Sequence, residues 1–368
     1  MKRFIAVAFF LSTLTIINTV SIISTEENYI RKIIASFKDG PKKQLFKVYH
    51  FLFNKEYDLN SEEGIKRYKI FKQNLKFHKE HNETPGVTFQ LGIGPFTDLT
   101  NEEFREKYLM DMKDDPTDTK LENTLDDDYY PDLDYTKYFN PVRRQEHCGS
   151  CWAFGAIASM EANYYMKSGK KLEFSEQELI DCDFKNRGCR GGYEDRAFEY
   201  VKNNGITLRE KYKYTSGETS FRDICKSKGT PRYNIVTGYE ECKDTECNKK
   251  KIMEMLKKGP ISVGVDAEGN GYFKEYHGGY YYFNKYSEYL LRCNKINHAV
   301  NVVGYINIDK PEKPEHKAYW KIRNSWGDTW GDNGYMKLVD TPHADSCLVT
   351  KEGFLIHVND AGPSPDPP

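Results

Sequence analysis

The sequence predicts an α+β protein in which a helical N-terminal region precedes a disulfide-bonded C-terminal region. Residues 26–112 lack cysteine, are rich in Lys, Glu and Phe, and contain polar residues at helical spacing. The apolar, β-branched run 296–305 is typical of a buried strand. All nine cysteines lie in the part of the chain that follows residue 135. A chain of 368 residues has the length of two or three domains.

Composition excludes several broad classes of protein. The 54 basic and 55 acidic side chains leave a net charge of -1, which gives no sign of a nucleic-acid footprint. The mean hydropathy of -0.75 excludes a polytopic membrane protein. The aromatic content of 14% is too high for a chain that is disordered throughout.

The N-terminus predicts entry into the secretory pathway. Met1, Lys2 and Arg3 form a basic start, an apolar run follows, and small residues lie beyond it, so a signal peptide is expected over residues 1–21. An uncleaved signal anchor is the rival interpretation, but six polar side chains interrupt the apolar segment. In an oxidising compartment, nine cysteines suggest four disulfides and one free thiol. The destination is expected to be the lysosome or the extracellular space.

A helix is expected over residues 58–82, followed by a short extended segment and a second helix capped by Thr100 with Glu103. An amphipathic helix with mixed faces explains the first spacing equally well. Residues 111–134 form an acidic linker that is expected to be flexible and open to cleavage. The Pro-rich tail, residues 360–368, is expected to be disordered. One face of the first helix contains Glu63, Arg67, Phe71, Asn74, His78 and Asn82.

The segment 145–154 carries the strongest functional signal, because a Cys-Gly-Ser-Cys-Trp run opens a helical pattern. Helical periodicity begins at Cys151 and ends near Gly169. The dipole and the unpaired N–H groups at a helix N-terminus favour a thiolate, which is the attacking species in cysteine catalysis. A structural Cys pair or half a zinc site is the alternative, but no second pair with metal spacing follows. We therefore predict Cys151 as a nucleophile.

Partners for this thiol occur further along the chain. His298 opens the predicted strand roughly 150 residues later, although a histidine there is about as often a core residue. Asn324 could accept the imidazole N–H, and Trp326 is positioned to cover that bond and exclude water. Gln145 could donate its amide N–H to a developing oxyanion, with the backbone N–H of Cys151 as the second donor.

With these motifs, the sequence resembles the papain family of cysteine proteases, and more closely the cathepsin L-like proenzymes, over nearly the whole chain after the signal peptide. The resemblance implies a papain-like two-lobed fold, with a helical left lobe and an antiparallel β-barrel right lobe. It also implies a helical inhibitory prosegment over residues 22–126, with an ERFNIN-like helix at 58–82. The mature peptidase would occupy residues 127–368.

In the prosegment, His78 departs from the isoleucine of the ERFNIN motif, which leaves its expected contact with a neighbouring helix in question. Gly92, Phe96 and Asp98 match the following short motif. The resemblance implies that the prosegment lies through the cleft in the non-productive direction. Acid is expected to weaken it by protonating carboxylates that pair with its Lys and Arg side chains.

The resemblance assigns roles to individual residues of the mature part. It implies Cys151 as nucleophile, His298 as general acid/base, Asn324 as orienter and Gln145 in the oxyanion hole. Surplus length relative to the family is expected in two surface loops, 240–251 and 307–317. The disulfides implied are Cys148–Cys189, Cys182–Cys225 and Cys293–Cys347, after which Cys242–Cys247 remains as a pair and Cys151 as the odd thiol.

The same resemblance suggests how a substrate would bind. An extended peptide would pair along Gly191 and Gly192, which allow close backbone approach. Glu352 would lie at the floor of the pocket for P2, the second residue before the cleaved bond, and would broaden a hydrophobic preference to include Arg. If Glu352 points into solvent instead, that broadening is lost. The other residues expected around the subsites are Tyr193, Ile296, Asn297, Ala299, Trp326 and Trp330.

The function expected is that of a secreted or lysosomal cysteine endopeptidase made as a zymogen. An exopeptidase of the same fold, suggested by His147, and a catalytically silent binding homologue are the alternatives. A transglutaminase-like acyl transferase would prefer Asp at position 324. No metal or cofactor is expected. The partners expected are protein and peptide substrates, the chain's own prosegment and cystatin-type inhibitors, with no nucleic acid, no stable membrane insertion and a monomeric state.

Overall fold

The computed structural model describes residues 42–111, 129–243, 246–268, 271–282, 295–340 and 349–364. The chain divides into two compact units, residues 1–56 and 57–368. In the first unit, helix α3 (Lys42–Leu52) packs Phe46 against Tyr49, and Tyr49 against Phe53 beyond its end. The predicted signal peptide lies outside the described residues.

The second unit opens with the prosegment helices. Helix α4 (Glu62–Asn82) begins where the hydroxyl of Ser61 accepts the N–H of Gly64, so it starts later than the predicted residue 58. Helix α5 (Asn101–Tyr108) begins with the capping box expected from Thr100 and Glu103. Between these helices lies the short strand β1 (Phe89–Leu91).

The predicted face of α4 links this helix to α5 and to the loop between the two helices. Arg67 forms ion pairs with Glu63 on its own helix and with Glu103 at the start of α5. Asn74 donates to the carbonyls of Thr97 and Leu99 on the intervening loop. These contacts fix the turn between α4 and α5 and thereby direct the chain after Tyr108.

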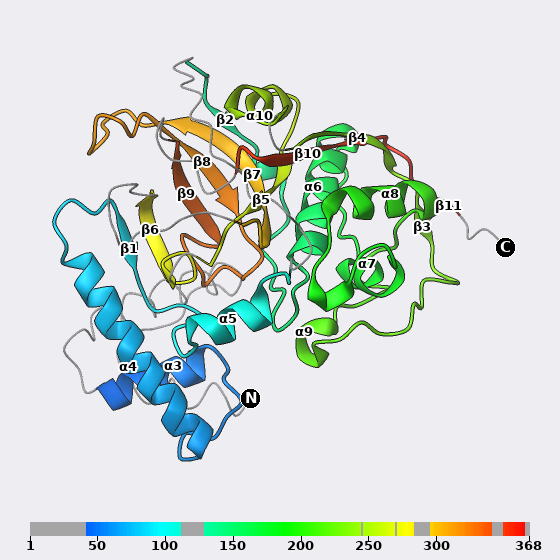
Figure 1. Cartoon of the computed structure of the whole chain (residues 1–368). Coiled ribbons are helices and arrows are strands. Elements are labelled where there is room, and N and C mark those ends of the chain that lie inside the picture. Colours follow the sequence, from blue (N-terminus) through cyan, green and yellow to red (C-terminus); the bar gives the residue numbers. More distant parts are fainter. Residues whose placement is uncertain are drawn as a thin grey trace, which may run out of the picture. The chain divides into compact units, whose positions relative to one another are not determined.

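Most strands form one nine-stranded sheet in the order β1-β6-β9-β8-β7-β5-β10-β4, with β2 paired to β7. The described strands do not close into the barrel that the resemblance implies: β1 and β4 end the order, and β6 pairs with β9 in parallel. Figure 1 shows this sheet beside the helices α6, α7 and α8. Its remaining strands are β2 (Leu133–Asp134), β4 (Val236–Lys243), β5 (Ile261–Val265), β6 (Tyr276–Tyr281), β7 (His298–Asn307), β8 (Ala318–Arg323), β9 (Tyr335–Asp340) and β10 (Glu352–Val358).

The helical lobe is built around α6 (Cys151–Ser168), which matches the predicted helix and ends at Gly169 with φ 70°. This helix packs on β7 and β10, so it joins the helical lobe to the sheet. Around it lie the other helices of the lobe, α7 (Glu176–Cys182), α8 (Glu194–Asn204), α9 (Ser216–Thr219) and the 3₁₀ turns η2 (Thr136–Tyr138) and η3 (Gly188–Arg190).

Two regions differ from the sequence-based expectation. The segment 240–251 is not one surface loop, because its first residues belong to β4 and its last belong to α10 (Lys249–Leu256). The tail is not disordered from residue 360 onward, because β11 (Pro363–Ser364) pairs with β3 (Arg232–Tyr233). The segment 307–317 is the hairpin loop expected between β7 and β8.

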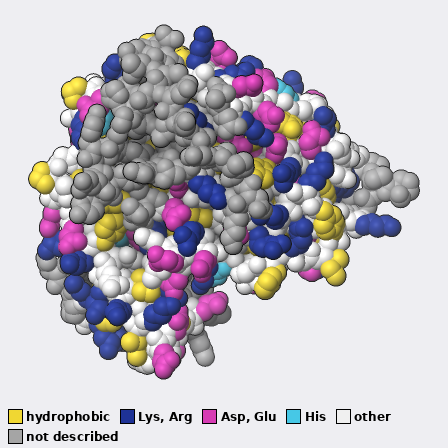
Figure 2. Space-filling view, in the orientation of Figure 1, with side chains coloured by type: hydrophobic (Ala, Val, Ile, Leu, Met, Phe, Trp, Pro, Cys, Tyr) yellow, Lys and Arg dark blue, Asp and Glu magenta, His cyan; other side chains and the backbone are white. Residues whose placement is uncertain are grey.

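Disulfides join three of the four expected pairs: Cys148–Cys189, Cys182–Cys225 and Cys242–Cys247. The pair Cys293–Cys347 lies outside the described residues. Basic and acidic side chains are interspersed over the described part of the face in Figure 2, consistent with the balanced composition. Among the described residues, no helix has both the length and the apolar character needed to span a bilayer.

Candidate active site

The predicted nucleophile lies at the start of α6, where the helical lobe meets the sheet. Cys151 is the first residue of the helix and Ser150 is its N-cap. It is the one free cysteine among the described residues, and its side chain is fully buried. The backbone of Ala299, at the start of β7, lies within hydrogen-bonding range of its sulfur. The nucleophile therefore faces the residue that follows His298.

The predicted histidine and asparagine are joined directly. His298 begins β7, and its Nε2 lies 2.8 Å from Oδ1 of Asn324, which directly follows β8. Because β7 pairs with β8, the sheet holds these two residues side by side. Nδ1 of His298 is buried with no hydrogen-bond partner among the described residues. The imidazole therefore has one fixed nitrogen and one available nitrogen.

Trp326 covers this pair, as expected. Its indole is stacked on the imidazole of His298 with ring centroids 4.5 Å apart. The indole N–H donates to Oε1 of Gln145, and the hydroxyl of Ser325 donates to the same oxygen. Both donors fix the orientation of the Gln145 amide, so its Nε2 points toward acceptors on the other side.

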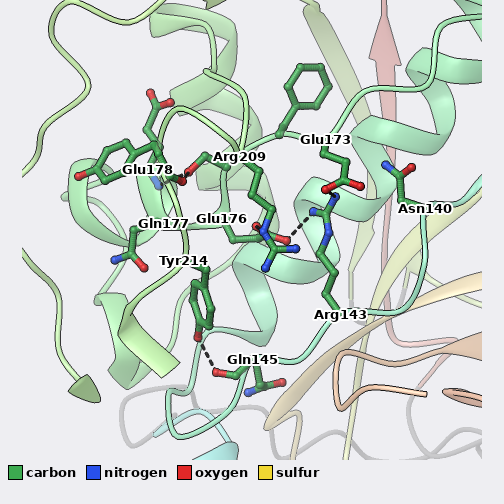
Figure 3. Close-up of polar contacts among 12 residues, drawn as sticks. Asn140, Arg143, Gln145, Glu173, Glu176, Gln177, Glu178, Arg209 and Tyr214 are labelled. Atoms are coloured by element: carbon green, nitrogen blue, oxygen red, sulfur yellow. Dashed lines mark hydrogen bonds and ion pairs between the residues drawn. The ribbon is translucent and has the colours of Figure 1, made fainter. Parts of the chain in front are cut away.

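Gln145 itself is held by a buried polar network that sequence reasoning missed. The hydroxyl of Tyr214 donates to the carbonyl of Gln145 (Figure 3). The same hydroxyl lies 3.0 Å from the hydroxyl of Ser150. Two residues before Gln145, the buried Arg143 forms ion pairs with Glu161 and Glu176. This network fixes the backbone on both sides of Gln145. No local motif marks Tyr214 for this role, because it lies 69 residues away in sequence.

The prosegment occupies the site. Rings of Phe96 and Phe104 each lie 5.2 Å from Trp326, edge to face. Nε2 of Gln145 donates to the carbonyl of Tyr108, at 2.9 Å. Further along, the N–H of Met110 donates to the carbonyl of Asn297. Residues 96–110 therefore cover the groups predicted to act in catalysis.

Burial shifts the pKa values of the Cys151 and His298 side chains. Desolvation raises the pKa of the Cys151 thiol to about 12. Desolvation also lowers the pKa of the His298 imidazole to about 4, although the hydrogen bond to Asn324 opposes that shift. Burial therefore disfavours the charged form of each side chain in this structure.

Most of the predicted subsite residues gather around Met110 of the prosegment. Met110 belongs to the same apolar cluster as Cys151 and Ala299, with Tyr193 and Ile296 packed against it. A Cβ on Gly191 would lie 3.0 Å from the Met110 side chain, so this glycine does allow a close approach. A Cβ on Gly192 would lie 2.6 Å from the side chain of Asn186 and 2.8 Å from that of Trp152.

The other predicted subsite residues described by the structure are Asn297, Trp330 and Glu352. The side chain of Asn297 is held by Asp266, so its carbonyl is the group offered to the prosegment. Trp330 packs edge to face on Trp326, and its N–H donates to backbone carbonyls. Glu352 begins β10 and is 9% exposed. It borders Ile296 through Gly264, because a Cβ on that glycine would meet both side chains.

Among the described residues, no group of three or more His, Cys, Asp or Glu side chains could hold a metal ion. One acidic residue near the site was missed by sequence reasoning. Glu194 directly follows Tyr193, at the first turn of α8, and its side chain is buried. The sequence signal that could have identified Glu194 is its position directly after Tyr193, a predicted subsite residue.

Comparison with known proteins agrees with this geometry. Residues 131–356 match the model of the papain family of cysteine proteases, and residues 46–104 match the cathepsin propeptide inhibitor domain. A probable cysteine protease, RDL2 of Arabidopsis thaliana, is 38% identical over 76% of each chain.

Two solved structures of proforms are also similar. A recombinant stem bromelain precursor superimposes with a TM-score of 0.71 at 30% identity, covering 86% of this chain and 99% of the other. A digestive procathepsin L 3 of Tenebrio molitor larval midgut superimposes with a TM-score of 0.70 at 25% identity, covering 87% and 100%.

Proposed function

Because this chain belongs to the papain family of cysteine proteases and carries a cathepsin-type propeptide domain, we propose that it is an endopeptidase made as an inhibited zymogen. The observation that carries this proposal is the 2.8 Å contact between His298 and Asn324, beside the buried thiol of Cys151. The catalytic residues proposed are Cys151, His298, Asn324 and Gln145.

The reaction begins with attack by sulfur. Sγ of Cys151 forms a bond to the carbonyl carbon of the substrate, and the thiol proton passes to Nδ1 of His298, the ring nitrogen that Asn324 does not occupy. His298 then protonates the departing amine as the C–N bond breaks. A water molecule, deprotonated by the same nitrogen, attacks the thioester and releases the acid and the thiol.

The negative charge that develops on the carbonyl oxygen needs donors. Nε2 of Gln145 is aimed at a backbone carbonyl oxygen in this structure, and the backbone N–H of Cys151 is the second donor proposed. Since Trp326 and Ser325 hold the other end of the Gln145 amide, little reorganisation is needed as charge develops.

The prosegment inhibits by occupying the same groups in the opposite direction. Its earlier residues, Phe96 and Phe104, contact Trp326, whereas its later residue Met110 contacts Gly191. A substrate would place its leaving-group side at Trp326 and its P2 side chain near Gly191, so the prosegment runs backwards and presents no bond for cleavage. Its departure restores solvent to Cys151 and so removes the cause of the raised thiol pKa.

We propose that the P2 pocket is lined by Tyr193, Ile296 and Ala299 and floored by Glu352. The apolar cluster around Met110 supports a preference for hydrophobic P2 side chains, and the carboxyl of Glu352 supports acceptance of Arg. Gly192 would pair with the substrate backbone, Asn297 would offer its carbonyl, and Trp330 would support Trp326 from behind.

Secretion and lysosomal delivery both fit a disulfide-bonded proform, so the site of action proposed is the lysosome or the extracellular space. The mature enzyme is proposed to span residues 127–368, to act as a monomer and to bind cystatin-type inhibitors. An exopeptidase would need an insertion at one end of the cleft. A silent binding protein would need loss of a catalytic side chain, whereas Cys151, His298 and Asn324 are all present.

The test is hydrolysis after acid activation with a thiol. The zymogen and a Cys151→Ala control would be incubated with two fluorogenic dipeptides, Phe-Arg and Arg-Arg. Turnover of Phe-Arg that is absent in the control supports the endopeptidase, and turnover of Arg-Arg supports Glu352 at the pocket floor. If neither peptide is cleaved although the prosegment has been removed, the binding-protein alternative replaces this proposal.

A further inference from the structure

Glu194 has a buried carboxyl group beside the proposed P2 pocket. Glu194 is 3% exposed, and its Oε1 has no hydrogen-bond partner among the described residues. The carboxyl group accepts a hydrogen bond from its own backbone N–H, but a buried oxygen left without a partner costs folding free energy and requires an explanation. Glu194 has no role in the catalytic steps described above.

The surroundings of Glu194 place its free oxygen against the pocket. A Cβ on Gly155 of α6 would lie 3.6 Å from Oε1 of Glu194 and 3.7 Å from Cβ of Ala299. Across the same pocket, a Cβ on Gly264 of β5 would lie 2.8 Å from Oε2 of Glu352. Gly264 is the register partner of Ala299. Two glycines thus leave room for two carboxyl groups on either side of Ala299.

The charged groups that face Glu194 come from three elements. Glu352 of β10 and Asp195 of α8 are acidic, and Lys243 of β4 is the one basic group among those that act on it most strongly. Lys243 is already paired with Asp195, at 3.1 Å, and with Glu241, at 3.3 Å. The thiol of Cys151, on α6, lies close enough to be affected by Glu194, and β5 contributes no titratable side chain. The pocket therefore has an excess of negative charge.

We propose that Glu194 is a second specificity-determining carboxylate, which acts with Glu352 to bind a P2 arginine or lysine side chain. This inference rests on the proposed endopeptidase function. A guanidinium in the pocket would supply the hydrogen bonds that Oε1 of Glu194 lacks, and would neutralise the excess charge. An uncharged P2 side chain would leave Oε1 of Glu194 without a hydrogen bond and the excess charge without a counterion. Glu194 and Glu352 therefore select for basic P2 residues.

Such a pair also makes selectivity depend on pH. Burial and the negative charge of Glu352 raise the pKa of Glu194 well above its ordinary value. Glu194 therefore stays protonated to a higher pH than an exposed glutamate does, and its ionisation as the pH rises further adds negative charge to the pocket. The preference for Arg over Leu at P2 increases as the pH rises.

The experiment compares kcat/KM for Arg-Arg and Leu-Arg fluorogenic dipeptides from about pH 4.5 to about pH 7.5. The enzymes are the activated wild type, Glu194→Gln and Glu352→Gln, with Glu199→Gln as a control that removes a carboxylate of the same helix that is paired with Lys202. Concentrations are set by active-site titration, so that misfolded enzyme does not enter the ratio. For Glu194→Gln, the Arg/Leu ratio near pH 7 is expected to fall about tenfold and to lose its rise with pH. Glu199→Gln is expected to keep the wild-type profile.

A Glu194→Gln enzyme with the wild-type ratio and pH profile would overturn the inference. If active-site titration detects no active Glu194→Gln enzyme, the wild-type profile decides. An Arg/Leu ratio that stays constant across the pH range in the wild type would also overturn the inference. Failure of the wild type to cleave either peptide would overturn the endopeptidase proposal itself. Cleavage of Leu-Arg with no effect of Glu194→Gln would overturn the role of Glu194 alone.

Discussion

The imidazole of His298 lies almost parallel to the indole of Trp326, with ring centroids 4.5 Å apart and an interplanar angle of 29°. The same indole donates its N–H to Gln145. Trp326 therefore contacts the proposed base and the proposed oxyanion donor at once. Misplacement of either would raise the barrier to reaction, because catalysis depends on positions held within a fraction of an ångström.

Replacement of Trp326 should separate these two effects. Trp326→Phe keeps a ring over His298 but removes the N–H that orients Gln145, so kcat is expected to fall about tenfold. Trp326→Ala also opens the His298–Asn324 bond to water, and a further fall of about tenfold is expected. Steady-state kinetics with Phe-Arg on titrated enzyme measure both. Equal kcat values for wild type and Trp326→Ala would refute the covering role.

Tyr214 should act on kcat through Gln145 without touching the substrate. Tyr214→Phe removes the hydroxyl that bonds to the carbonyl of Gln145 and lies close to Ser150. We expect kcat to fall about tenfold with KM nearly constant, since the loss is in transition-state stabilisation. Tyr212→Phe is the matched control, because its hydroxyl also donates to a buried acceptor, Asp181, away from Gln145. If both variants lose stability and kcat equally, Tyr214 is merely structural.

The contacts of Glu275 with the prosegment should persist in mild acid. In this interface Thr97, His78 and Lys274 all bond to the buried carboxylate of Glu275. Burial alone would raise its pKa, but the charge of Lys274 and the bond from His78 outweigh it and lower the pKa to about 2. A lowered pKa stabilises the folded form fully above the unfolded value of 4.5, and this contribution is lost as the pH falls from there to about 2.

Urea unfolding of Cys151→Ala zymogen, with and without Glu275→Gln, tests this. The difference in free energy of unfolding between the two proteins should be constant between about pH 7 and about pH 5, and should shrink toward zero near about pH 2. Glu268→Gln is the control, because Glu268 pairs with Arg105 at the exposed surface. A difference that disappears by pH 5 would mean that Glu275 is an acid sensor for activation.

The disulfides in the described part of the chain should contribute unequally to stability. The Cys182–Cys225 bond spans 43 residues, whereas Cys242–Cys247 spans 5. Loop-closure entropy predicts losses of about 4 and about 2 kcal/mol when each pair is replaced by serine. Denaturant midpoints of the two double variants in a Cys151→Ala background measure the difference. A larger loss for the short loop would show that β4 depends on its bond for geometry and not for chain entropy.

Residues with a local signature could be predicted from the sequence, and those defined by long-range contacts could not. Cys151, His298 and Asn324 stand in recognisable motifs, and the structure brings the last two into hydrogen-bonding contact. The helix from Cys151 was predicted to within a residue, because its C-terminal Gly169 is a strong stop signal. Tyr214 and Glu194 carry no motif, because their roles arise only when distant elements pack together.

His78 illustrates why a departure from a motif could not be interpreted in advance. The sequence indicates only that a histidine replaces an apolar residue on one face of α4. In the structure its partner is Glu275, 197 residues away, which turns an expected apolar contact into a polar one. Whether the sheet closes into a barrel could likewise not be predicted from the sequence. Strand order depends on which strand edges meet and not on local periodicity.

The pairing of β1 with β6 has a consequence for the life of the enzyme after activation. Phe89 and Gln90 of the prosegment are register partners of Gly279 and Gly278 in β6. Once the prosegment leaves, β6 becomes an edge strand, and the backbone groups that it shared with β1 must be hydrated or paired with another chain. Self-association through this edge would grow with protein concentration, so the zymogen is the more soluble form for storage and transport.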